Sequence, residues 1–158
     1  MRLRRGFTLL ETLVVLTLMG IVMAMAAPRV RAGTETANRK AARDVAANYA
    51  NTARRIAVAR ASGTHLVVNG NVLSVTVDQQ VGTAPVTPQT NLYSQFGTTL
   101  SFQFLNGASA GSEIAFDKRG MLRDGVNLTR KLVVVSASGL RDSVCISGAG
   151  MVMRGACR

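Results

Sequence analysis

The sequence predicts an α+β protein, with a long N-terminal helix that crosses a membrane and an antiparallel β-sheet or β-sandwich head. A predominantly apolar run occupies residues 7–27, directly after a short basic leader. An apolar stripe with helical spacing continues to about residue 61. From residue 62 onward, apolar and polar residues alternate in short runs between turn residues, as in half-buried strands.

The basic leader and the apolar run define how the chain meets the membrane. Residues 1–6 hold three arginines and no acid. At about 1.5 Å rise per residue, a helix of the following run covers roughly 30 Å, the thickness of a bilayer's hydrocarbon core. The arginines should keep the N-terminus cytoplasmic, so that the rest lies across the membrane. We divide the chain into a leader (1–6), a membrane-spanning half-helix (7–28), an outer half-helix (29–61) and a head (62–158).

Glu11 is the most informative residue, because it lies inside the apolar run. A carboxylate near the bilayer centre costs about 2.5–3.5 kcal/mol, and less toward an end. Such a charge usually persists because it has a partner. A conventional secretory signal cleaved near Ala24–Ala27 is disfavoured, because its apolar core is shorter and does not hold a carboxylate.

The order Arg5-Gly6-Phe7-Thr8-Leu9-Leu10-Glu11 resembles the processing motif of type IV pilins and pseudopilins. The resemblance implies that a prepilin peptidase cuts between Gly6 and Phe7 and that Phe7 is then N-methylated. It further implies a single-pass inner-membrane protein with a periplasmic head, which assembles with other pilin subunits into a pilus or pseudopilus. Pro28 matches the helix-kinking proline of that family.

The expected cleavage gives Glu11 a partner. It leaves a cationic amine on Phe7, four residues before Glu11 and about 6 Å away along the helix axis. In a filament, the Glu11 carboxylate can pair with the Phe7 ammonium of a neighbouring subunit. Such a pair removes a buried unpaired charge and fixes the stagger between subunits.

Beyond the apolar run, Pro28 should kink or end the helix, which resumes after a weak region at Gly33–Thr36. One apolar stripe then predicts packing on the head: Val45, Tyr49, Ala53 and Ile56. Three arginines fall roughly opposite this stripe: Arg39, Arg43 and Arg54.

The head is expected to begin with a hairpin, in which His65–Val68 and Asn71–Val77 flank an Asn69-Gly70 turn. The segment Gly82–Gln95 contains two prolines and is interpreted as a loop or irregular edge. Further strands are expected at Leu100–Phe104, Ile114–Asp117, Met121–Arg123, Lys131–Ser136 and Ser143–Ser147.

Cysteine and histidine usage argues against a metal site and against catalysis. His65 is the only histidine, and neither Cys145 nor Cys157 belongs to a Cys-x-x-Cys pair. Outside the cytoplasm, the simplest interpretation is a Cys145–Cys157 disulfide that closes a short C-terminal loop. We expect no cofactor, no metal, no catalytic residues and no enzymatic activity.

The formal charge of +11, carried mostly by arginine, indicates anionic partners. From Lys118 onward, eight cations stand against two acids. A basic surface of this kind can hold a phosphate backbone without reading sequence. The candidates for non-specific DNA binding are Arg130, Arg141, Arg154 and Arg158, and the alternative is docking to acidic patches on neighbouring subunits.

The closing Val-Cys-Ile-Ser-Gly-Ala-Gly…Arg…Cys segment is similar to the GspH/FimT group of minor pilins and pseudopilins. This resemblance implies a minor pilin that helps to initiate type IV pili and, in some members, takes up DNA. A minor pseudopilin of a type II secretion system is the alternative, and a nucleic-acid-binding module is an alternative of another class. The Gly-Arg-x-Arg motif of the DNA binders is incomplete, because the chain has Gly150-Met151-Val152-Met153-Arg154.

Overall fold

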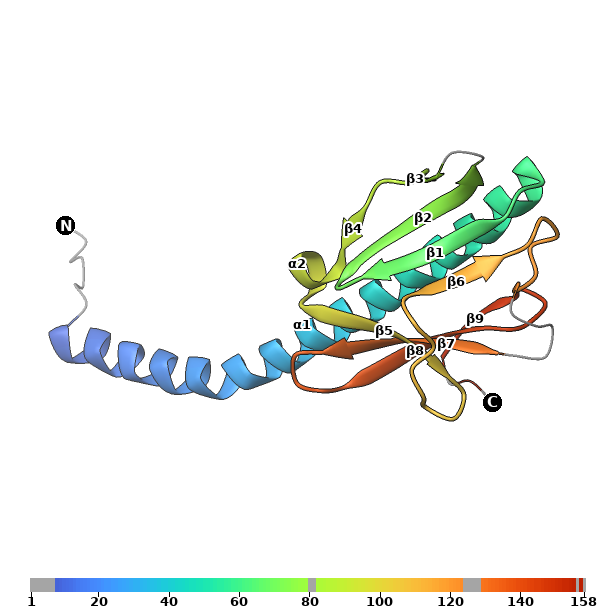
Figure 1. Cartoon of the computed structure of the whole chain (residues 1–158). Helices are drawn as coiled ribbons and strands as arrows, with labels where there is room; N and C mark the ends of the chain where they lie inside the picture. The colour runs from blue at the N-terminus through green and yellow to red at the C-terminus, as the bar shows by residue number, and fades with distance from the viewer. Residues whose placement is uncertain (1–7, 80–81, 124–128, 156, 158) are drawn as a thin grey trace. The chain divides into compact units, whose positions relative to one another are not determined.

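The computed structural model describes residues 8–79, 82–123, 129–155 and 157. The chain forms two compact units, residues 1–36 and residues 37–158, and helix α1 (Leu9–Arg60) contributes to both. Figure 1 shows the order of the elements along the chain. The expected α+β class, a long apolar N-terminal helix followed by antiparallel sheets, is confirmed.

In the first unit, α1 continues through Pro28 and through the Gly33–Thr36 region, where the sequence suggested a kink or a weak point. The helix does not end there. Proline removes only one hydrogen-bond donor, and two threonines that follow bond back to the helix. The hydroxyls of Thr34 and Thr36 donate to the carbonyls of Arg31 and Ala32, at 2.9 and 3.0 Å.

The early part of α1 is long and apolar enough to cross a membrane. None of the residues in that stretch is buried by the described part of the chain, and large apolar side chains from Leu9 to Val30 are exposed to at least 45%. Apolar side chains exposed to water are unfavourable, whereas the hydrocarbon of a bilayer accommodates them. The first unit is therefore built for an apolar environment outside the chain itself.

The second unit holds two antiparallel sheets. The first sheet has the order β3-β2-β1-β6, with β4 also paired to β2. Its strands are β1 (Thr64–Asn69), β2 (Val72–Gln79), β3 (Gly82–Pro85), β4 (Thr90–Asn91) and β6 (Glu113–Phe116). The second sheet has the order β5-β7-β8-β9. Its strands are β5 (Thr98–Phe104), β7 (Arg130–Ser136), β8 (Arg141–Ile146) and β9 (Val152–Arg154).

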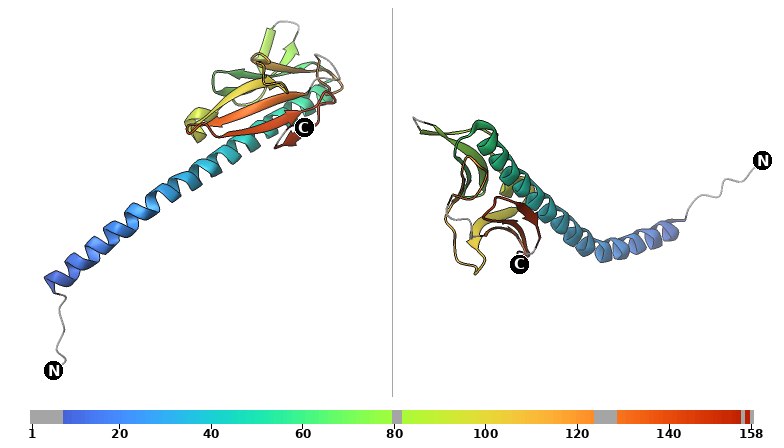
Figure 2. Two further views of the ribbon diagram at one scale, coloured as in Figure 1. Left: turned by 90° about the horizontal axis from the view of Figure 1, so that it is seen from below. Right: turned by 90° about the vertical axis from the view of Figure 1, so that its right-hand side faces the viewer.

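Both sheets lie on one side of the Ala37–Arg60 part of α1 (Figure 2). The face of α1 that they cover is made of alanine: Ala42, Ala46, Ala47, Ala50, Ala53 and Ala57, all fully buried. Small side chains let the sheets approach the helix backbone closely. The hydroxyl of Thr64 donates to the carbonyl of Ala53 at 2.9 Å, which ties β1 to the helix.

The predicted helix stripe is correct only in part. Ala53 is buried, but Val45, Tyr49 and Ile56 are partly buried and pack at the margin of the core. The buried face is set by the alanines, and larger side chains fill the space beside them. A hydrophobicity pattern ranks valine and isoleucine above alanine, so it places the centre of the stripe too far to one side.

Most strands agree with the expected positions, but the strand expected at Met121–Arg123 is reduced to one isolated bridge between Phe116 and Leu122. In the first hairpin Asn69 pairs with Val72, so the turn residues are Gly70 and Asn71, one position later than predicted. Gly70 has φ +61°, which suits the first central position of such a turn. The predicted irregular edge contains β3, β4 and the short helix α2 (Leu92–Phe96), which Asn91 caps. Strand β9 was not predicted.

Candidate functional site

The start of α1 holds the residues of the processing motif that the structure describes. Gly6 and Phe7, the predicted cleavage site, lie outside the described residues. Thr8 precedes the helix, and its side-chain oxygen accepts a hydrogen bond from the Glu11 N–H at 3.3 Å. The pattern Thr-x-x-Glu is a capping box, which satisfies backbone N–H groups at a helix start. The structure shows the Thr8 half of this box, a local role at the helix start that sequence analysis missed.

Glu11 also lies where a helix favours negative charge. The first turn of α1 contains this one acidic residue, and the helix dipole stabilises a carboxylate there. The residues around it are exposed and apolar, including Leu10 and Leu13 at 73% and 58% exposure. A carboxylate in such a surface is available to a cation from another subunit once lipid and neighbouring helices surround it.

One of the arginines predicted to face away from the head instead contacts it. Arg43 bonds to Asp142 on β8 at 3.3 Å and to the adjacent Asp44 at 3.1 Å. Because the buried face is centred on Ala42 and Ala46, Arg43 lies at its edge and reaches the second sheet. The prediction for Arg43 was therefore wrong. This ion pair links α1 to the second sheet.

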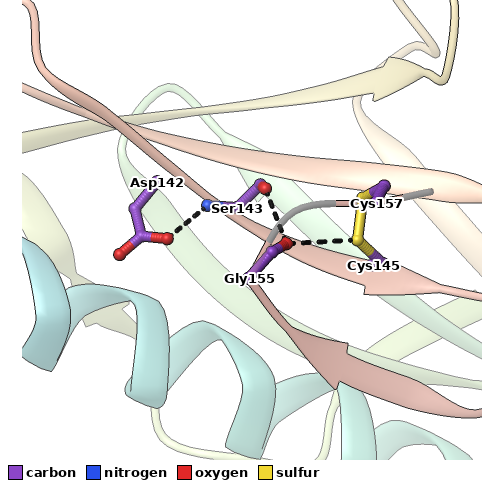
Figure 3. The surroundings of a disulfide bond; sticks show 5 residues. All are labelled: Asp142, Ser143, Cys145, Gly155 and Cys157. Atoms are coloured by element: carbon purple, nitrogen blue, oxygen red, sulfur yellow. Dashed lines mark hydrogen bonds between the residues drawn. A yellow bond between two sulfur atoms is a disulfide. The ribbon is translucent and has the colours of Figure 1, made fainter.

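At the other end of the chain, the structure contains the predicted Cys145–Cys157 disulfide. On the face of the second sheet opposite to α1, Gly155 and Cys157 contact Ser143 and Cys145. Ser143 donates its hydroxyl to the carbonyl of Gly155 at 3.0 Å (Figure 3). The Cys145 sulfur lies 3.4 Å from the same oxygen, and this is a packing contact because a disulfide sulfur carries no hydrogen. The bridge thus holds the C-terminal segment on the sheet.

Replacing both cysteines by serine is expected to destabilise the second unit by about 3 kcal/mol. Closing a loop of about this length lowers the entropy of the unfolded chain by that amount. A urea titration of the detergent-solubilised protein, followed by limited proteolysis, measures the change. In the exported wild-type protein, thiol labelling should modify neither cysteine. Two reactive thiols in that sample would contradict the bridge.

The described arginines proposed for DNA binding are not brought together. Arg130 is only 7% exposed, and its guanidinium lies 4.0 Å from the centre of the Phe104 ring. This burial contradicts its assignment to a DNA-binding surface. Arg154 lies 3.6 Å from Asp44 of α1, and Arg141 is exposed at the other end of the β7–β8 pair from Arg130. Arg158 lies outside the described residues.

A second polar cluster lies on the outer face of the first sheet. The His65 ring bonds to Asp78 at 2.7 Å and lies 3.6 Å from Glu113, while Arg123 bonds to Asp78 at 3.0 Å. Hydrogen bonding to His65, together with the charges of His65 and Arg123, lowers the pKa of the Asp78 carboxyl. Among the described residues, no group of three histidine, cysteine or acidic side chains could hold a metal ion.

This lowered pKa gives a testable pH dependence. A carboxyl that is more acidic in the folded state adds stability above its unfolded pKa and loses it as the pH falls through the folded value. The Asp78→Asn variant should therefore lose less stability than the wild type as the pH falls below the ordinary pKa range of a carboxyl group. The control is Glu113→Gln, which should keep most of that loss. Urea midpoints measured from pH 7 to pH 3 test this. An equal fall of the urea midpoint at acid pH in the wild type and in Asp78→Asn would contradict it.

Comparisons with known proteins agree with the sequence motif and with the fold. Residues 1–27 match the family model of the prokaryotic N-terminal methylation motif. The fold is similar to the crystal structure of the type IV minor pilin FimU from Pseudomonas aeruginosa strain PAO1. The TM-score is 0.62 at 18% identity, over 78% of this chain and 92% of FimU. A second FimU crystal form gives 0.58 at 19% identity, over 74% and 92%. No curated protein matches.

The long apolar helix and the two-sheet head have a type IV pilin-like fold, and residues 1–27 carry the prokaryotic N-terminal methylation motif. The fold similarity is to FimU, a minor pilin, in both crystal forms. The motif implies processing by a prepilin peptidase, and the apolar helix indicates a membrane anchor.

Proposed function

We propose that this chain is a minor subunit of a type IV pilus, with its head in the periplasm before assembly and no enzymatic role. The observation that carries the proposal is the position of Glu11. It is the one charged residue in the 7–28 segment and lies four residues after the expected cleavage site. A buried charge of that kind needs a partner, and the Phe7 ammonium of the next subunit provides one.

One observation favours a pilus over a type II secretion pseudopilus. The similar solved structure is that of a pilus subunit, and it covers most of both chains. The C-terminal segment resembles the GspH/FimT group, which includes both kinds of subunit, so it does not separate them. Pilus-assembly genes next to the coding gene would support the pilus, whereas secretion genes would favour the pseudopilus.

We do not include nucleic-acid binding in this function. Arg130 is buried and Arg154 faces an acid of α1, so the described candidates do not form one basic track. DNA uptake would require phosphate contacts along a continuous surface.

Intact-mass measurement of the protein from membranes tests the proposal. The mature chain should lack residues 1–6 and carry one extra methyl group on Phe7. The matched control is Gly6→Leu, which should keep the leader. A mature chain that begins after Ala27 would show a conventional signal peptide and would contradict the proposal.

A further inference from the structure

A polar pocket lies on the outer face of the second sheet, beside Cys157. The pocket has a volume of about 260 Å³. Cys157 lies on one side, and strands β5, β7 and β8 supply the other lining residues, which include Gln103, Lys131, Arg141 and Ser143. The pocket therefore depends on the disulfide, because the bridge holds Cys157 in the wall (Figure 3).

The pocket has an excess of positive charge. Lys131 and Arg141 have no ion-pair partner among the described residues. The one acid in the lining, Asp142, bonds to Arg43 at 3.3 Å and accepts the Ser143 N–H at 2.8 Å. Its charge is already compensated, so two cations and the amide of Gln103 remain available to an anion.

A second copy of this chain is a poor source of that anion. In the described part of residues 37–158, each acid already has a partner within the chain. Asp44 and Asp142 contact arginines, Asp78 and Glu113 contact His65, and the Asp117 carboxylate accepts backbone N–H groups of its own turn. With a net charge of +11, two copies also repel each other.

We infer that this pocket binds the carboxylate side chains of an extended acidic segment on a different filament subunit. This inference rests on the proposed function, which supplies the neighbouring subunit. The guanidinium of Arg141 forms the fork that suits a carboxylate, and Lys131 provides a second point charge. Lys131 and Arg141 lie four strand positions apart, roughly 13 Å, so an extended segment with acids at that spacing meets both.

An acidic polypeptide fits this surface better than nucleic acid does. Backbone phosphates need a row of cations, whereas Val133 and Cys157 lie in the lining together with the two cations. Arg130 and Arg154 belong to the opposite face of the sheet, where they contact Phe104 and Asp44. The described basic residues of this sheet are thus divided between its two faces.

Fluorescence anisotropy with the detergent-solubilised full chain tests this inference. The probes are a labelled peptide of alternating glutamate and serine, and a labelled DNA duplex. Lys131→Gln/Arg141→Gln should weaken peptide binding by at least about tenfold, because it removes two charged hydrogen-bond donors. The matched control is Lys118→Gln/Arg119→Gln, which removes the same charge from two exposed residues in the turn after β6. It should change binding by less than about twofold, since Lys118 and Arg119 lie outside the pocket lining and an isolated exposed charge contributes little.

Several outcomes would overturn the inference. Equal loss in both variants would show attraction by overall charge, and no peptide binding at low salt would remove the site. DNA binding that is lost only in the pocket variant would make this a nucleic-acid site instead. Unchanged urea midpoints show that both variants are folded. The processing test does not depend on this pocket, so correct processing without peptide binding would contradict the pocket alone.

Discussion

Replacing Glu11 by glutamine is expected to leave the protein in the membrane but to exclude it from filaments. Membrane insertion should become easier, because a charge that is costly in hydrocarbon is removed. In the filament, the Phe7 ammonium of the neighbour loses its partner, and an unpaired buried charge costs about 3–5 kcal/mol. Recovery of the variant in sheared filaments should fall by more than about a hundredfold, measured by immunoblot against the membrane fraction.

The choice of glutamine separates the charge of Glu11 from the capping-box pattern that it completes with Thr8. Glutamine preserves the capping box with Thr8, so the helix start is retained while the charge is lost. The matched control is Thr8→Ala, which weakens the cap by about 1 kcal/mol but keeps the carboxylate. This control should still enter filaments. Normal incorporation of Glu11→Gln together with loss of Thr8→Ala would assign Glu11 to capping and refute the pairing.

Gly150→Ala should unfold or strongly destabilise the second unit. Gly150 has φ +75°, and a Cβ there would overlap the carbonyl oxygen of Gly120. The two glycines belong to turns that contact each other, and the Leu122 N–H donates to the Gly148 carbonyl at 3.0 Å between them. These turns follow β6 and β8, so the contact joins the two sheets. Positive φ and backbone overlap together should cost about 3–5 kcal/mol.

Gly97→Ala is the matched control for this effect. Gly97 has a similar φ of +64°, but a Cβ there meets nothing within 4 Å. The substitution should cost only the conformational strain, about 1–2 kcal/mol. Urea titration with limited proteolysis compares the two variants. A Gly150→Ala midpoint equal to that of Gly97→Ala would contradict the importance of the turn contact.

The apolar start of helix α1 was predictable because its signals are local. The position of Glu11 in an apolar run, the length of that run and the Arg-Gly-Phe-Thr order all depend on neighbouring residues alone. The first hairpin was predictable for the same reason, to within one residue at its turn. The disulfide was predictable because the chain has only two cysteines.

The head's packing was decided by contacts between distant segments. Which helix face is buried depended on how closely two sheets approach a row of alanines, and hydrophobicity does not measure that distance. Strand β9 is three residues long and exists through its pairing with β8. The roles of Arg130, Arg141 and Arg154 were likewise set by tertiary structure. The sequence determined their charge, but the side chain's neighbours determine whether a charge stacks on an aromatic ring, pairs with an acid or remains available to a partner.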